Sequence, residues 1–366
     1  MRKDFAEKTK FYMWGDNAMI QEKKQFSYEN LSKYRNVLMG VQIILIIAFH
    51  FSGDAYYVRG SRIIQLFYKY IRSSGVDMFL LLSGIGLYFS WKKRPEAKRF
   101  YIKRYTRILI PYFIVAIPSW LWLDIFYEHQ GWGAFIQDLF FVTFFSEGER
   151  WFWYIVMAAF CYWVFPYIFN IIESAADRLS AQMRILLLCV TSTSILVMLQ
   201  LYNNELYNCI GIALLRIPAF LIGVLIGKAV YEKKKIPKNR IYLMAAVAII
   251  LAWPLQFIGI KILGTYTLGY LNYSLMMLFV LVLEYLSARK SLGLKICRVI
   301  TSVFGWFGKY TLELYLTHVA VRLVMKRFGF PTYRLSGEAL LVVISIILSL
   351  IISRMTGYIQ KKIVKF

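Results

Sequence analysis

Apolar runs of about 20 residues recur from one end of this chain to the other, and they constrain its fold more than any other feature. As a helix rising 1.5 Å per residue, a run of that length matches the ~30 Å hydrocarbon core of a bilayer. Hydrophobic residues make up 59% of the 366 residues and charged residues only 17%, unlike a soluble domain. Short alternating segments, which a β-barrel needs, are lacking. We therefore predict an all-α, polytopic membrane protein with about ten transmembrane helices in one bundle.

The expected spans are residues 36–52, 74–91, 104–126, 150–172, 184–202, 209–229, 241–258, 270–287, 309–326 and 338–357. A shorter apolar run at 134–145 is too short to span easily, and its flanks carry no Lys or Arg, so we expect a re-entrant or interfacial helix on the outer side. The expected division is a cytosolic N-terminal segment (1–34), one transmembrane domain (35–358) and a cytosolic C-terminal tail (359–366). The first segment has no apolar core or cleavage site of a signal peptide.

Lys and Arg gather in alternate connections between the spans, at 1–35, 91–107, 228–240 and 289–298. The connections at 127–149 and 203–208 have none, whereas those after the first and ninth spans are weaker exceptions. The positive-inside rule then places both termini in the cytosol. The net charge of +24 falls in these clusters rather than on one continuous stripe, so nucleic acid is not an expected partner. The cysteines and histidines show no metal-ligand spacing, so we predict neither a metal site nor disulfides.

A histidine and an aspartate carry the first candidate chemistry. His50 ends the first span at its outer side, and Asp77 begins the second span, so antiparallel neighbours would bring the two side chains to a similar depth. A carboxylate on one ring nitrogen leaves the other nitrogen as a base. The alternative is a polar pair that is merely satisfied near the headgroups. Both interpretations stay open from these two residues.

Arg104 and Arg107 lie three residues apart at the cytosolic start of the third span, so they share a helix face. Guanidinium forks at a helix N-terminus suit a phosphate group, and Lys103 is adjacent. Ordinary positive-inside anchoring explains the same charges without a ligand.

Arg216 lies inside the sixth span with Pro218 two residues on, and an arginine at that depth costs ~3 kcal/mol. It predicts an internal cavity or ion pair, and snorkelling to the outer surface is the competing account. His318 lies mid-span, with Glu313 five residues earlier on a different face, so those two do not form a relay by themselves. A packed, hydrogen-bonded interior histidine is the favoured interpretation of His318.

These motifs, taken in order, resemble a known family. The stretches GVDMFLLLSGIGLYF, RFYIKRYTRILIPYF, LLRIPAFLIGVLIG and YTLELYLTH follow a first helix that ends in histidine. This arrangement resembles the membrane-bound acyltransferase family 3, bacterial O-acyltransferases with ten core helices, over about residues 33–358. The resemblance is to a stand-alone form without an SGNH domain.

The resemblance implies roles for individual residues. His50 would be the catalytic histidine with Asp77 beside it, and Arg104, Arg107 and Lys103 would contact acyl-CoA. Residues matching the second-helix motif are Gly75, Asp77, Phe79, Ser83 and Gly84. Relatives carry an arginine eleven residues before the histidine, where this chain has Met39; Arg35, one turn nearer the cytosol, is the expected partial substitute. Arg216 and His318 would belong to the acceptor or oxyanion pocket.

The expected activity is transfer of an acyl group, with acetyl preferred, from cytosolic acyl-CoA to a hydroxyl of a cell-envelope polysaccharide or other glycan. Acyl-CoA is then a donor substrate, and no cofactor is bound. Partners are membrane lipid, the donor and the glycan, and the expected location is the bacterial plasma membrane. The sequence leaves the oligomeric state open. Two alternatives stay open: a transporter or flippase without covalent chemistry, disfavoured by the lack of inverted repeats, and an acyltransferase acting on a lipid or small molecule.

Overall fold

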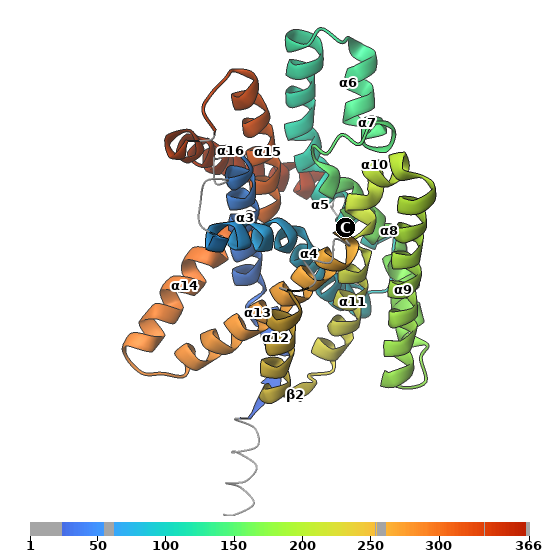
Figure 1. Ribbon diagram of the computed structural model, residues 1–366, viewed down its shortest axis with the longest axis vertical. Coiled ribbons are helices and arrows are strands. Elements are labelled where there is room, and N and C mark those ends of the chain that lie inside the picture. Colours follow the sequence, from blue (N-terminus) through green and yellow to red (C-terminus); the bar gives the residue numbers. More distant parts are fainter. Residues whose placement is uncertain (1–23, 55–61, 253, 255–260, 333, 364–366) are drawn as a thin grey trace, which may run out of the picture.

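The computed structural model describes residues 24–54, 62–252, 254, 261–332 and 334–363, of which residues 51–54, 62–75 and 261 are described by their backbone alone. Helices make up nearly all of this part of the chain (Figure 1). The all-α, polytopic fold class is confirmed. Each of the ten predicted spans falls on a helix or a pair of consecutive helices as far as it is described; the end of the span predicted at 241–258 lies outside the described residues. Within the described part, six helical stretches are long and apolar enough to cross a membrane.

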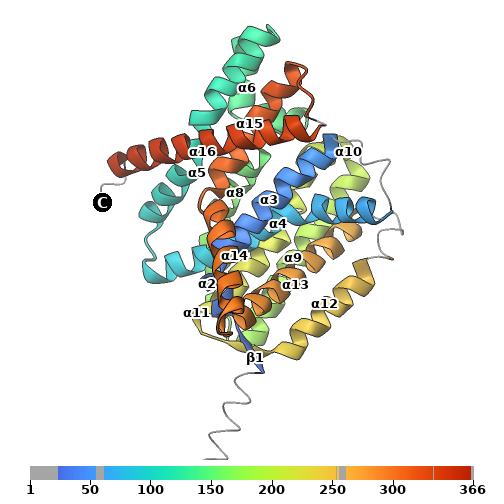
Figure 2. The same cartoon turned by 90° about the vertical axis from the view of Figure 1, so that its left-hand side faces the viewer.

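The core of the bundle is built on α3 (Arg35–Asp54) and α4 (Arg62–Lys93), which pack against each other (Figure 2). Helix α14 (Leu292–Lys309) packs along α3, so closely that two glycines are required. A Cβ on Gly40 would collide with the carbonyl of Phe304, and a Cβ on Gly308 with the carbonyl of Asn36. Small residues at such contacts allow helix backbones to approach closely in membranes.

A second close contact joins α4 to the broken sixth span, which consists of α10 (Asn204–Leu214) and α11 (Ile217–Tyr231). A Cβ on Gly84 would lie 2.6 Å from the Val224 nitrogen, and a Cβ on Gly223 would collide with the Leu81 carbonyl. Gly84, one of the residues that match the second-helix motif, therefore allows this close packing. At one end of this contact, Glu173 accepts hydrogen bonds from Tyr88, at 2.9 Å, and from Lys92.

The third span consists of α5 (Ala97–Trp120), extended by a π-helical segment, η2 (Leu121–Tyr127). The predicted interfacial run forms two short helices, α6 (Trp132–Leu139) and α7 (Val142–Ser146), which lie at the top of Figure 1. Then α8 (Trp153–Glu173) packs along α5, and α9 (Arg178–Tyr202) forms the right-hand edge of the view.

The remaining helices are α12 (Lys238–Ala252), α13 (Lys261–Ser287), α15 (Thr311–Arg327) and α16 (Leu335–Ile363). Helix α15 is buried on all sides from Glu313 to Val321, so it lies inside the bundle rather than facing lipid. The spans predicted at 309–326 and 338–357 correspond to α15 and α16. Sequence reasoning did not predict α14, which precedes α15.

A small antiparallel sheet holds the chain just before the first helix. Strand β1 (Gln25–Ser27) pairs with β2 (Lys235–Pro237), with Phe26 opposite Ile236, and α2 (Glu29–Lys33) follows β1. Phe26 and Leu31 are fully buried. The C-terminal part of the segment predicted as 1–34 is therefore packed against the loop between α11 and α12, while residues 1–23 lie outside the described part.

Candidate functional site

Two histidines from different helices meet inside the bundle. The Nδ1 atom of His50, on α3, lies 2.8 Å from the Nε2 atom of His318, on α15. The Nδ1 atom of His318 lies 3.0 Å from the carbonyl oxygen of Leu314, one turn earlier on α15. A carbonyl can only accept, so the Nδ1 atom of His318 carries the proton. In the neutral ring its Nε2 atom then accepts a hydrogen bond from the Nδ1–H of His50.

This order of hydrogen bonds leaves one nitrogen of the pair available. The Nε2 atom of His50 keeps its lone pair in that tautomer, which the hydrogen-bond network assigns. His318, 1% exposed, is fixed by packing, and His50 is less buried. Among the described residues no hydrogen-bond partner meets Nε2, and an imidazole oriented through its other nitrogen in this way is the arrangement that a general base or nucleophile needs. His318 is thus the packed, hydrogen-bonded histidine that the sequence indicated, and in addition it contacts His50.

Arg322 lies one helical turn beyond His318, and its Nη2 atom is 3.5 Å from the carbonyl oxygen of His50. Sequence reasoning missed this residue. The signal was its i+4 spacing from His318, which puts both side chains on one helix face.

Asp77 has a different partner from the one expected. Its Oδ2 atom lies 2.5 Å from the Nη1 atom of Arg216, and both side chains are buried. Among the described residues no hydrogen bond joins His50 to Asp77, so the predicted orientation of the imidazole by this carboxylate is wrong; His318 has that position instead. Arg216 lies at the break between α10 and α11 and faces inward. The ion-pair interpretation of Arg216 is confirmed, and snorkelling is wrong.

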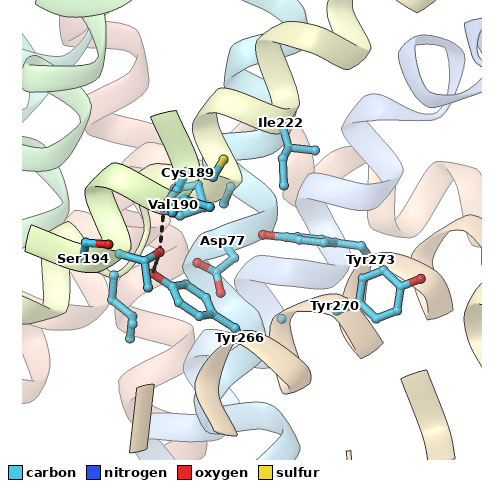
Figure 3. Close-up of a pocket in the computed structure, with 13 residues that line it drawn as sticks. Asp77, Cys189, Val190, Ser194, Ile222, Tyr266, Tyr270 and Tyr273 are labelled. Atoms are coloured by element: carbon cyan, nitrogen blue, oxygen red, sulfur yellow. Dashed lines mark hydrogen bonds between the residues drawn. The ribbon is translucent and has the colours of Figure 1, made fainter. Parts of the chain in front are cut away.

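The ion pair adjoins a cavity of about 400 Å³ between α4, α9, α11 and α13 (Figure 3). Figure 3 shows the carboxylate of Asp77 beside the rings of Tyr266 and Tyr273. The hydroxyl oxygens of Tyr266 and Thr193 are 3.1 Å apart. Most of the remaining lining is apolar, including Val190, Leu215, Pro218 and Ile222.

Three arginines of α3 and α5 lie close together in the same bundle. The charges of Arg35, Arg104 and Arg107 lie close enough to interact with one another, and the Tyr162 hydroxyl on α8 is near Arg104 and Arg107. The guanidinium of Arg35 contacts α4, where a Cβ on Gly86 would be 3.3 Å from its Cζ atom. The Nε atoms of Arg35 and Arg104 are buried and have no hydrogen-bond partner among the described residues.

Lys103, the remaining residue of the predicted donor site, is exposed on α5. Met39, at the position where relatives carry an arginine, packs in apolar contacts of α3. Arg35 is thus the cation that α3 brings to this cluster. Among the described residues no carboxylate forms an ion pair with these three arginines, and such a group of cations suits a polyanion such as a phosphate ester.

Tyrosine rings connect the arginine cluster to the histidine pair. Tyr154, on α8, lies near Arg35, and its ring centroid is 5.5 Å from that of Tyr315. The Tyr315 ring in turn lies 5.9 Å from the ring of His318. Sequence reasoning did not identify these two tyrosines, because only the crossing of α8 and α15 makes them neighbours.

Comparison with known proteins adds one finding at the level of the family. A family model described as an acyltransferase domain, of the third acyltransferase type, matches residues 34–355. This range begins beside Arg35 and ends within α16, so it includes every residue of the candidate site. No curated protein and no solved structure matches the chain.

Proposed function

The chain belongs to the acyltransferase family 3, and from this premise we propose that it transfers an acyl group, with acetyl preferred, from cytosolic acyl-CoA to a hydroxyl of a cell-envelope glycan. The observation that carries the proposal is the His50–His318 hydrogen bond, which leaves the Nε2 atom of His50 without a partner among the described residues, in one bundle with a cluster of three arginines. The location that fits this activity is the bacterial plasma membrane, with both termini in the cytosol.

The donor binds first through its phosphates, to the guanidinium groups of Arg35, Arg104 and Arg107. Its thioester then lies along Tyr154 and Tyr315, toward the histidine pair. Because the phosphates are strongly hydrated, they stay near the cytosolic side, and only the less polar arm enters the bundle. Lys103, exposed on the same helix, adds to the attraction of the anionic donor at longer range.

In the transfer step the Nε2 atom of His50 removes the proton from the acceptor hydroxyl. The acceptor oxygen forms a bond to the thioester carbonyl carbon, the carbon–sulfur bond breaks, and the CoA thiolate takes the proton from the imidazolium. A variant of this route forms the acyl bond first to Nε2 and then transfers the acyl group to the acceptor. In both routes the His50–His318 hydrogen bond holds the tautomer that leaves Nε2 available.

A lipid or small-molecule acceptor is the second candidate, favoured by the largely apolar cavity of about 400 Å³ beside the Asp77–Arg216 pair. In this proposal Arg216 acts in the acceptor pocket. It neutralises Asp77, so that an uncharged acceptor meets no unpaired charge there.

Inverted membrane vesicles, which expose the cytosolic face, test the proposal when radiolabelled acetyl-CoA is added. Label in a polymer supports the glycan acceptor, and label in lipid or a small molecule supports the second candidate. His50→Ala should lose transfer while inserting at the wild-type level, since it lacks the proton-accepting nitrogen. Full transfer by that variant would end the histidine mechanism, and the absence of label with the wild-type chain would favour a transporter.

A further inference from the structure

A buried carboxylate near the arginine cluster has no role in the mechanism above. Glu313 lies in the first turn of α15 and is only 6% exposed. Its Oε2 atom is buried and has no hydrogen-bond partner among the described residues. This oxygen of Glu313 is therefore left with its hydrogen-bonding capacity unused by the described part of the chain.

The surroundings of Glu313 make this free oxygen informative. Arg107 is close enough to interact with its charge. The Nε atoms of Arg35 and Arg104, on α3 and α5, are also buried without partners. A buried polar atom without a partner costs ~1–3 kcal/mol, so such atoms are rare in folded proteins. Three such atoms belong to charged side chains of this one neighbourhood, on α3, α5 and α15, and a ligand bound among them would satisfy them.

The position of Glu313 along α15 suggests which part of a ligand it meets. Five residues separate Glu313 from His318, which is a rise of ~7.5 Å along the helix. In acyl-CoA the thioester is followed, toward the phosphates, by two amide groups, and covalent bonds of ~1.3–1.5 Å put the amide nitrogens within ~4–9 Å of the sulfur. A donor with its thioester at the histidine pair and its phosphates at the arginines would thus carry an amide past Glu313.

We propose that the Oε2 atom of Glu313 accepts a hydrogen bond from an amide N–H of the pantetheine arm of the donor. This inference rests on the proposed function, which it refines: the arginines bind the phosphates, and Glu313 recognises the arm. A carboxylate suits an N–H donor and repels phosphate, so it also prevents the phosphates from sliding deeper into the bundle. Glu313 is a binding residue in this account and takes no part in the proton transfer.

Two substitutions and two modified donors test the proposal. Glu313→Met removes the acceptor at similar length, and Glu313→Gln keeps an acceptor oxygen without the charge. In each modified acetyl-CoA one pantetheine amide N–H is replaced by an ester oxygen. Loss of a hydrogen bond to a charged group should raise the KM of the Met variant for acetyl-CoA about tenfold or more, with kcat within about threefold. The KM of the Gln variant for acetyl-CoA should lie between those of the Met variant and wild type.

The modified donors separate recognition from a merely structural effect. With the wild-type protein, one ester donor should have a KM higher than that of acetyl-CoA by about the same factor as the Met substitution produces. With the Met variant, the same ester donor should raise the KM little further. Glu338 is another buried carboxylate in the first turn of a helix, so Glu338→Gln is the matched control. It should leave the KM for acetyl-CoA unchanged, and also the factor by which each ester donor raises that KM. Should the Met variant fail to insert, the Gln variant completes the same comparison.

The outcomes distinguish this inference from the function on which it rests. If wild type transfers acetyl and His50→Ala does not, but both ester donors change KM equally in wild type and in the Glu313 variants, the inference is wrong and the function stands. A Met variant with an unchanged KM for acetyl-CoA would likewise show that the inference is wrong while the function stands. If wild type transfers nothing from acetyl-CoA, both fail together.

Discussion

At the scale of single residues, the reactive nitrogen of His50 is determined by a carbonyl oxygen two hydrogen bonds away. The Leu314 carbonyl fixes the proton on His318, and His318 in turn fixes the proton on His50. A carboxylate in this position would add a full charge to the centre of the bundle, where an unpaired charge is expensive. A second imidazole orients the first without that charge. Asp77 meanwhile neutralises Arg216, which would otherwise be a buried cation.

Substitution of His318 tests this arrangement. His318→Ala removes the acceptor for the Nδ1–H of His50, and we expect kcat to fall by a factor on the order of 10² or more, because the imidazole then adopts other orientations and tautomers. His318→Gln keeps a side-chain oxygen that can accept, so it should retain more activity than the Ala variant. Initial rates of acetyl transfer in vesicles measure both. Equal and near-wild-type rates in the two variants would contradict the role of His318.

At the scale of elements, glycines determine how closely α3 is held. Gly40 and Gly308 bring α3 against α14, and Gly84 and Gly223 bring α4 against α11. Because α3 carries both Arg35 and His50, its position relative to its neighbours sets the geometry of the arginine cluster and the histidine pair at once. The short β1–β2 pair adds a further restraint just before α3 begins.

A pair of glycine substitutions measures this dependence. Gly40→Ala places a Cβ against the Phe304 carbonyl, so α3 and α14 must separate, and we expect a lower melting temperature in detergent together with reduced transfer. Gly305→Ala, on α14, is the matched control, since its Cβ meets nothing within 4 Å. The control should be neutral or more stable by up to ~1 kcal/mol, because alanine favours the helix. Equal melting temperatures for the two variants would show that the close contact is unimportant.

At the scale of the whole molecule, the positive-inside rule predicts a cytosolic side that is rich in Lys and Arg, and the Arg35 cluster lies toward that side in the predicted topology. The histidine pair lies farther along α3 and α15, which both run away from it in the predicted topology. Donor and acceptor can therefore approach from opposite faces and meet between the helices. The outer helices α6 and α7, between α5 and α8, lie on the acceptor side in this topology.

A reporter inserted within residues 127–149 tests the topology. The segment contains no Lys or Arg, so the positive-inside rule predicts that it faces away from the cytosol. A periplasm-active reporter enzyme should be active there, and a cytosol-active one inactive. A fusion in 228–240, which is rich in Lys, is the control and should behave in the opposite way. A cytosolic result for 127–149 would reverse the proposed approach of donor and acceptor.

The sequence by itself determined the helical membrane fold, the position of each span, and the presence of His50, Asp77, Arg216 and the arginines as candidate groups. It could do so because the length of an apolar run and the cost of a buried charge are local properties of the chain. The partners of those groups were decided only by the tertiary structure. His50 meets His318, 268 residues later, and Asp77 meets Arg216, 139 residues later. Such pairs depend on which helices cross, and at what rotation, which is set by packing at contacts such as Gly40 with Phe304 and not by any local pattern.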